Sequence, residues 1–210
     1  GIYVILDVVI NHMSDLAGVP YGSDDAQYWP GGNPSYTWWD TRRHRGAFNR
    51  LDFFHHNGTI NNWDASPENL LGQFKGTDDL ATERADVQYE LDIAFKNLIS
   101  ATDCDGFRVD AIKHVEYNWC KQWADDMRQH AASLGKSDFL LFGELFSYDN
   151  AALASYCSDN GYSFNSALFF PMANTIKSVF KDGGGTGQLT SQRSNISQYG
   201  EGADRLVTFI

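Results

Sequence analysis

Arg108 and Asp110 lie two residues apart in the segment GFRVD, a spacing that can serve covalent catalysis. In an extended strand their side chains point to the same face. A guanidinium beside a carboxylate favours the charged form of the acid and lowers its pKa. An ionised carboxylate is what a covalent nucleophile requires. A purely structural Arg–Asp pair at a strand end explains this segment equally well.

Glu144 follows the apolar run FLLFG. Gly143 leaves room for close approach, and hydrophobic surroundings raise the pKa of a carboxyl group by desolvation. An isolated glutamate in this position is more often a solvated or capping residue. Together, Asp110 and Glu144 give one ionised and one protonated carboxyl group on neighbouring strand ends. A retaining glycosidase holds such a pair about 5–5.5 Å apart and forms a glycosyl-enzyme intermediate.

A third polar cluster, Asp7, Asn11 and His12, follows the first apolar run. The amide oxygen of Asn11 suits a hard cation such as calcium. His12 can donate a hydrogen bond to a sugar hydroxyl. For the Asn–His pair alone, a turn with a packed histidine is the favoured interpretation.

The elements that carry these residues alternate between strand and helix. The nearly continuous apolar run 1–9 predicts a strand that is buried on both faces. Further strands are predicted at 106–110, 139–142, 164–170 and 205–210, and helices at 87–99, 119–127, 149–158 and 172–181; 183–187 is a glycine-rich loop. This alternation indicates a parallel sheet with crossover helices, either a closed barrel or an open doubly wound sheet. Acidic residues at the carboxyl ends of three strands favour the barrel.

Residues 13–81 interrupt this pattern. They are rich in Gly, Pro, Asn, Asp, Trp and Tyr and lack helical periodicity, which indicates either disorder or an inserted functional subdomain. The many aromatic residues favour an ordered insertion. The chain is therefore divided into 1–12, the inserted domain 13–81, and 82–210.

The composition narrows the possible partners. A net charge of −11 and a pI near 4.8 argue against nucleic acid and are compatible with a neutral or cationic ligand. No apolar run approaches the roughly 18 residues of a membrane span, and no signal peptide is seen.

At most one disulfide can form among the three cysteines, Cys104, Cys120 and Cys157, and we expect them to be buried small side chains.

Three segments, DVVINH, GFRVDAIKH and GELF, resemble consecutive signatures of the α-amylase family, glycoside hydrolase family 13, in sequence, order and strand context. The resemblance covers essentially the whole chain. It implies an α/β fold, a partial (β/α)8 TIM barrel from about the third to the seventh strand, with the B domain inserted after the third. It also implies retaining endo-hydrolysis of α-1,4-glucosidic bonds in starch- or glycogen-type glucans.

The resemblance assigns a role to each matching residue. Asp110 would be the nucleophile and Glu144 the acid/base, with Arg108 holding the nucleophile and Asp7 supporting the loop that follows it. The expected sugar-binding residues are His12, Lys113 and His114.

The resemblance also implies a calcium ion. Its expected ligands are Asn11, His114 through the backbone carbonyl, and Asp79 in the segment Gly76–Leu80. That segment departs from the family motif, which usually carries proline and leucine where this chain has Asp78 and Thr77. A cation shared by these ligands would tie the loop-rich insertion to the barrel.

Other activities remain open for these residues, and the resemblance also bears on the extent, oligomeric state and location of the protein. A transglycosylase of the same family, such as a cyclodextrin glucanotransferase, shares both carboxyl groups; a non-catalytic relative or an enolase-type metal site is less favoured. The resemblance implies a third catalytic aspartate, which is expected after residue 210, and 210 residues are fewer than the roughly 250 of a complete barrel. The chain is thus expected to be a fragment that is inactive and poorly folded by itself. A monomer is expected, and the size of starch polymers predicts an extracellular location.

Overall fold

A computed structural model describes residues 1–18, 27–40, 42–74, 76–158 and 164–209. The chain forms two compact units. The sheet unit comprises Gly1–Val8, Lys96–Ile112 and Cys120–Ile210, and the insertion unit comprises Val9–Phe95 and Lys113–Trp119. The predicted insertion 13–81 thus falls within one unit, together with the first turns of the helix that follows it.

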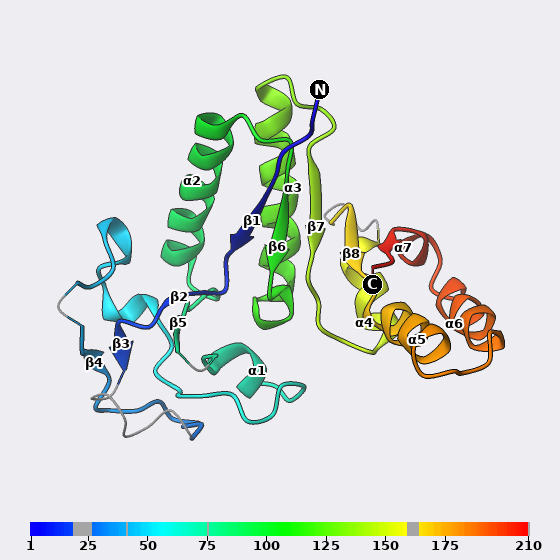
Figure 1. Cartoon of the computed structure of the whole chain (residues 1–210). Helices are drawn as coiled ribbons and strands as arrows, with labels where there is room; N and C mark the ends of the chain where they lie inside the picture. Colours follow the sequence, from blue (N-terminus) through cyan, green and yellow to red (C-terminus); the bar gives the residue numbers. More distant parts are fainter. Residues whose placement is uncertain (19–26, 41, 75, 159–163, 210) are drawn as a thin grey trace. The chain divides into compact units, whose positions relative to one another are not determined.

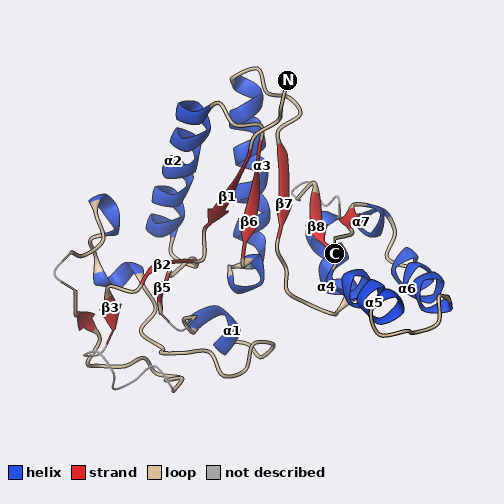
Figure 2. Ribbon diagram, viewed as in Figure 1, coloured by secondary structure: helices blue, strands red, loops and turns tan. Residues whose placement is uncertain are grey.

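Five strands form the main sheet in the order β1-β6-β7-β8-β9 (Figures 1 and 2). Their bounds are β1 Ile5–Val9, β6 Gly106–Asp110, β7 Leu140–Gly143, β8 Ser166–Leu168 and β9 Leu206–Val207. The pairs β6–β7, β7–β8 and β8–β9 are parallel, and helices lie between these strands in the sequence. The predicted parallel sheet with crossover helices is therefore confirmed.

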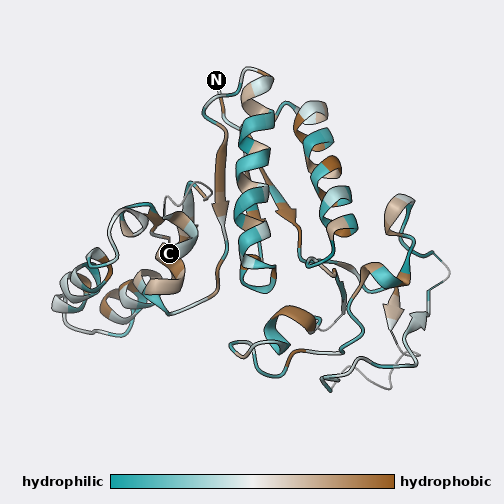
Figure 3. Ribbon diagram, turned by 180° about the vertical axis from the view of Figure 1, so that it is seen from behind, coloured by the Kyte–Doolittle hydropathy of each residue, from teal (hydrophilic) through white to brown (hydrophobic). Residues whose placement is uncertain are grey.

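The prediction for the first strand is wrong in one respect. The strand begins at Ile5, and it is not buried on both faces, since Ile5 and Val9 are each 36% exposed. The preceding Ile2 and Tyr3 are 93% and 84% exposed. Within the described residues β1 is the edge of the sheet, with β6 as its neighbour. Figure 3 shows that this edge strand is apolar.

The helices follow the predicted pattern with shifted ends. They are α2 Ala85–Thr102, α3 Tyr117–Ser133, α4 Asn150–Cys157 and α5 Phe170–Phe180, followed by the unpredicted α6 Gly187–Ser197 and α7 Glu201–Asp204. The α3 helix packs on the sheet through the buried Trp123, whose ring lies 6.4 Å from that of Phe107 on β6.

The predicted last strand is shorter than expected, and Ile210 lies outside the described residues. No helix of the described residues combines the length and apolarity needed to cross a membrane.

The described residues of the insertion unit pack around a core of their own, as its aromatic content predicts. Its elements are β2 His12–Ser14, β3 Ala17–Gly18, β4 Thr37–Trp38, the 3₁₀ helices Gly46–Phe48 and Leu51–Phe53, α1 Glu68–Leu71 and β5 Thr77–Asp79. The strands β2 and β5 are antiparallel, with His12 opposite Asp79. Phe53, Phe54 and Leu80 pack in the buried core with residues of α2. In the sheet unit, the three cysteines are buried, as expected, and each is a free thiol.

Candidate active site

Arg108 gathers three carboxyl groups in the sheet unit. Along β6, Phe107 and Val109 are fully buried, while Arg108 and Asp110 share the partly exposed face, as the strand alternation predicts. Arg108 Nη1 donates to Asp110 Oδ1 at 2.7 Å and to Asp7 Oδ1 at 2.8 Å. Arg108 Nη2 donates to the carboxylate of Glu144. Three of the predicted site residues therefore meet at the guanidinium of a fourth.

The register of β6 and β7 brings the two principal acids together. Val109 pairs with Gly143, and the ladder continues one step further because the backbone N–H of Glu144 donates to the carbonyl of Val109 at 2.8 Å. The N–H of Ile112 then donates to the carbonyl of Glu144 at 3.1 Å. A Cβ on Gly143 would lie 2.3 Å from Ile112 Cδ1, so any larger residue would displace the Ile112 side chain; glycine allows the close approach that the sequence predicts.

The backbone turns directly after Asp110. Ala111 has a φ of 53°, a left-handed conformation that costs an L-residue roughly 1–2 kcal/mol. Such strained residues cluster at functional sites. The turn ends the strand at Asp110 and starts the 3₁₀ helix Ile112–His114. Nothing in the residue type of Ala111 predicts this conformation.

The electrostatics of the site favour a protonated Glu144. Burial raises the pKa of Glu144 above its usual value, and its hydrogen bond to Asp110 together with the charges of Asp110 and Asp7 adds to this, against the opposing charge of Arg108. A hydrogen bond between two carboxyl groups requires a proton on one of them. Glu144 is the group whose pKa is raised, and it can therefore hold that proton and donate it.

The predicted sugar-binding residues lie together in the insertion unit. The ring of Phe74 lies 5.0 Å from His12 and 4.9 Å from His114, and Trp63 lies 5.6 Å from His114. Lys113 Nζ pairs with Asp64 Oδ1 at 2.5 Å, next to Trp63 in the sequence. This aromatic cluster, His12, Trp63, Phe74 and His114, presents the indole of Trp63 to solvent, with the residue 45% exposed.

Burial also favours the neutral form of His114 in this cluster. It lowers the pKa of His114, whose Nδ1–H donates to the carbonyl of Asn69 at 2.7 Å. His114 therefore stays neutral near pH 7. Trp63 and Phe74 were not among the predicted site residues; the only available signal was a tryptophan in the polar stretch NNWD.

Asn11 and Asp79, two predicted calcium ligands, are in contact in the insertion unit. Asn11 Nδ2 donates to Asp79 Oδ1 at 3.0 Å, and both residues are buried. Within the described residues, the buried Asn11 Oδ1 has no hydrogen-bond partner. Burial raises the pKa of Asp79 to about 7, against the lowering effect of His55 and Asn11. An unpartnered amide oxygen beside a carboxylate fits a hard cation with oxygen ligands.

Binding of a cation beside Asn11 and Asp79 depends on neutral oxygen ligands. Across residues 1–18, 27–40, 42–74, 76–158 and 164–209, no group of three His, Cys, Asp or Glu side chains is arranged to hold a metal. A cation here would therefore need amide and carbonyl oxygens beside the carboxylate, and Asn11 and the His114 carbonyl are of this type. The neighbouring Asp78 is occupied elsewhere, because its carboxylate accepts from the N–H groups of Leu16 and Ala17.

His55 connects the buried Asp79 to a more exposed acid. Its Nδ1 lies 2.7 Å from Asp79 Oδ2, and its Nε2 lies 2.9 Å from Glu83 Oε2. Burial alone would lower the pKa of His55, but hydrogen bonds to the two carboxylates and their charges raise it to about 9.

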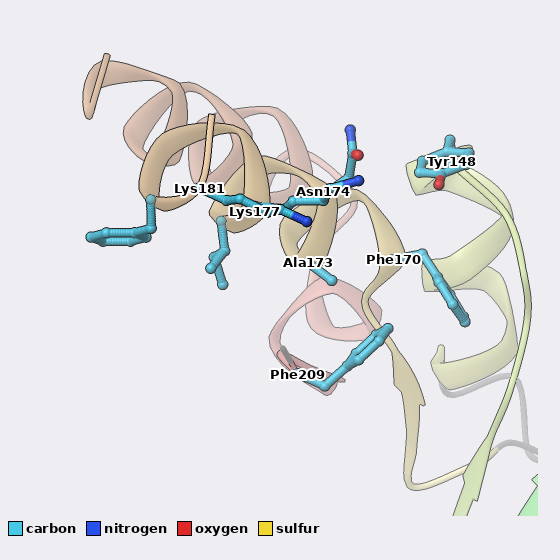
Figure 4. A pocket seen from close by; sticks show the side chains of 9 residues that line it. Tyr148, Phe170, Ala173, Asn174, Lys177, Lys181 and Phe209 are labelled. Carbon is cyan, nitrogen blue, oxygen red and sulfur yellow. The ribbon is translucent and has the colours of Figure 1, made fainter. Parts of the chain in front are cut away.

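A hollow of about 580 Å³ lies in the sheet unit. Aromatic residues and two lysines line it, and Figure 4 shows Phe170 and Phe209 on one side and Lys177 and Lys181 on the other. Asp110, Glu144 and the other predicted site residues of this unit are not among its lining residues. The site is therefore defined by its acidic residues and not by this cavity.

Comparison with known proteins agrees with the motifs. Residues 1–203 match the family described as alpha amylase, catalytic domain. The α-amylase of Streptomyces lividans is 28% identical over 225 residues, which covers 91% of this chain and 24% of the relative. The solved α-amylase of Geobacillus thermoleovorans, complexed with acarbose, has a TM-score of 0.74 at 25% identity and covers 100% of this chain.

A second solved structure carries a different activity in its description. A cyclomaltodextrin glucanotransferase with a three-domain ABC distribution has a TM-score of 0.74 at 28% identity, again over 100% of this chain. The chain spans 24% of the Streptomyces relative and 40% of each of these two structures.

Proposed function

Because the chain belongs to the α-amylase catalytic-domain family and folds as part of a (β/α)8 barrel, we propose that it carries the retaining site of an enzyme acting on α-1,4-glucans of the starch or glycogen type. The observation that carries this proposal is the contact of Arg108 with both Asp110 and Glu144. Two carboxyl groups at adjacent strand ends, one of them able to hold a proton, are the essential parts of a retaining glycosidase.

The two acids have different roles in the proposed reaction. Asp110 attacks the anomeric carbon and forms a glycosyl ester while Glu144 donates its proton to the departing oxygen. Glu144 then accepts a proton from water, which hydrolyses the ester. Arg108 orients both carboxyl groups. The hydrogen bond between the acids must open when substrate enters, since a retaining pair stands about 5–5.5 Å apart.

Substrate binding is assigned to the aromatic cluster and its neighbour Lys113. His12 and Lys113 can hydrogen-bond sugar hydroxyls, and the exposed face of Trp63 offers an apolar surface on which a pyranose ring can stack. Asp64 pairs with Lys113 and must share it with an incoming hydroxyl. A neutral glucan is compatible with the net charge of −11.

We propose calcium as the cation, with Asn11 Oδ1, the Asp79 carboxylate and the His114 carbonyl among its ligands. The cation would tie together segments of the insertion unit that are far apart in sequence and have little regular structure. The support is the unpartnered Asn11 oxygen beside a buried carboxylate.

Transglycosylation is the second candidate activity, favoured by the similarity to the cyclomaltodextrin glucanotransferase structure. Both activities use the same nucleophile and acid/base; they differ in whether water or a sugar hydroxyl attacks the ester. Product analysis on starch separates them, since endo-hydrolysis gives linear oligosaccharides and the transferase gives cyclic ones. Asp110, Glu144 and Arg108 are all present, which disfavours a non-catalytic relative.

Substitution of the two acids tests the proposal in a closed barrel that contains these 210 residues. Glu144→Gln is expected to lower kcat on starch by about 10²–10⁴-fold, the usual contribution of general acid–base catalysis. Asp110→Asn should lower it at least as much. Asp103→Asn, an exposed site with φ of 54° that asparagine tolerates, is the matched control. Full activity of either acid variant would refute the assignment.

We further propose that the protein is a monomer and acts outside the cell, where starch polymers are found. Size-exclusion chromatography with light scattering tests the first point, and fractionation of the producing culture tests the second.

A further inference from the structure

His55 is placed between two carboxylates by contacts from both its side chain and its backbone. The imidazole bridges Asp79 Oδ2 and Glu83 Oε2 at 2.7 and 2.9 Å. The backbone N–H of His55 also donates to the carbonyl of Asp79 at 2.9 Å. His55 and Asp79 are both buried, whereas the side chain of Glu83 is 46% exposed. His55 and Asp79 are thus joined by a side-chain and a backbone hydrogen bond, and Glu83 binds the other ring nitrogen of His55.

These contacts determine which way the Asp79 carboxylate faces. His55 holds Oδ2, and the Asn11 amide donates to Oδ1 at 3.0 Å. The backbone of Asn11 is held as well, because the N–H of Leu80 donates to its main-chain carbonyl at 2.8 Å. The unpartnered Asn11 Oδ1 and the Asp79 carboxylate are consequently held side by side within the described residues.

We propose that His55, anchored by Glu83, is a positioning residue of the cation site, and that it holds the Asp79 carboxylate in the orientation that lets it share one calcium ion with Asn11 Oδ1. The inference rests on the proposed calcium site and adds residues that do not touch the ion. Groups that orient a metal ligand from behind typically change metal affinity by 10–100-fold when they are substituted.

Calcium affinity, measured by isothermal titration calorimetry, tests this role without reference to activity. His55→Gln keeps a polar side chain but cannot bridge both carboxylates, and we expect about 10–100-fold weaker calcium binding. Glu83→Gln removes only the outer charge from a partly exposed position, so the fold is preserved and a smaller loss in the same direction is expected. His56→Gln is the matched control, because the adjacent His56 binds the Leu51 carbonyl and stacks on Tyr36.

The outcomes separate this inference from the proposed calcium site. If the unmodified protein binds calcium and both His55→Gln and Glu83→Gln bind it within twofold of that affinity, the positioning role is overturned and the site stands. If the unmodified protein binds no calcium, the site itself is wrong and the inference falls with it. Equal weakening by His56→Gln would also overturn the inference, because the effect would then not pass through Asp79.

Discussion

At the residue scale, one arginine organises the site. The spacing of Arg108 and Asp110 predicted their pairing, because residues i and i+2 of a strand share a face. The contacts of Arg108 with Asp7 and Glu144 join residues 101 and 36 positions apart, so local spacing could not predict them. The elevated pKa of Glu144 agrees with the expectation from its apolar surroundings, and contact with Asp110 adds to it.

Asp7→Asn is expected to shift the pH dependence of activity. The charge of Asp7 raises the pKa of Glu144, so its removal lowers that pKa. The general acid must be protonated, and the basic limb of the kcat/KM profile should therefore move to lower pH. Asp204→Asn, which alters a distant exposed pair with Arg193, should leave the limb in place. A limb that stays fixed or moves to higher pH in Asp7→Asn would contradict the electrostatic account.

Trp63→Ala should weaken substrate binding more than it slows the chemical step. Loss of an aromatic stacking surface typically costs about 0.5–1.5 kcal/mol, which corresponds to a rise in KM of roughly two- to tenfold. Trp63→Phe retains an aromatic face and should recover most of the affinity. A change in kcat with unaltered KM for maltooligosaccharides would show that Trp63 is not a sugar platform.

At the element scale, the carboxyl ends of β6 and β7 position the acids. Both strands were predicted, β7 from the apolar run FLLF, and their parallel orientation was predicted from the strand–helix alternation. The burial of β1 was predicted wrongly, because periodicity reports apolarity and not which neighbours cover a strand. The α6 helix was not predicted because GQLTSQRSNIS has no apolar face, and Ile196 is its buried residue.

Gly143→Ala is expected to destabilise the protein by about 1–3 kcal/mol, the usual cost of overpacking. The new methyl group would lie 2.3 Å from Ile112 Cδ1. Ile112→Val removes that atom, so the double variant should regain part of the loss, measured as the free energy of unfolding in urea. Gly187→Ala, with nothing within 4 Å of its new Cβ, is the control. Additive effects of Gly143→Ala and Ile112→Val would show that the two side chains do not clash.

At the scale of the whole molecule, the chain combines a parallel sheet that carries the acids with an insertion that carries the aromatic cluster and the cation site. Composition predicted an ordered insertion, and three motifs predicted the family. The internal contacts of the insertion could not be predicted, because they arise between loop residues with no periodic pattern. His55, 24 positions from Asp79, is an example.

Chelation should loosen the insertion and lower activity together. Removal of a ligand that binds only the folded state lowers the melting temperature, by an amount set by its concentration relative to Kd. We expect EDTA to lower the Tm in calorimetry and to open residues 13–81 to proteolysis, and calcium but not magnesium to restore both. An unchanged Tm in EDTA would count against the calcium proposal.

The most direct test of the central claim is to trap the glycosyl-enzyme intermediate. A closed barrel containing these residues is incubated with a fluorinated α-glucosyl fluoride, which slows hydrolysis of the ester, and digested for peptide mass spectrometry. We expect one hexosyl-type adduct on Asp110 that is absent in Asp110→Asn. An adduct on a different residue, or turnover with inversion of the anomeric centre and no adduct, would contradict it.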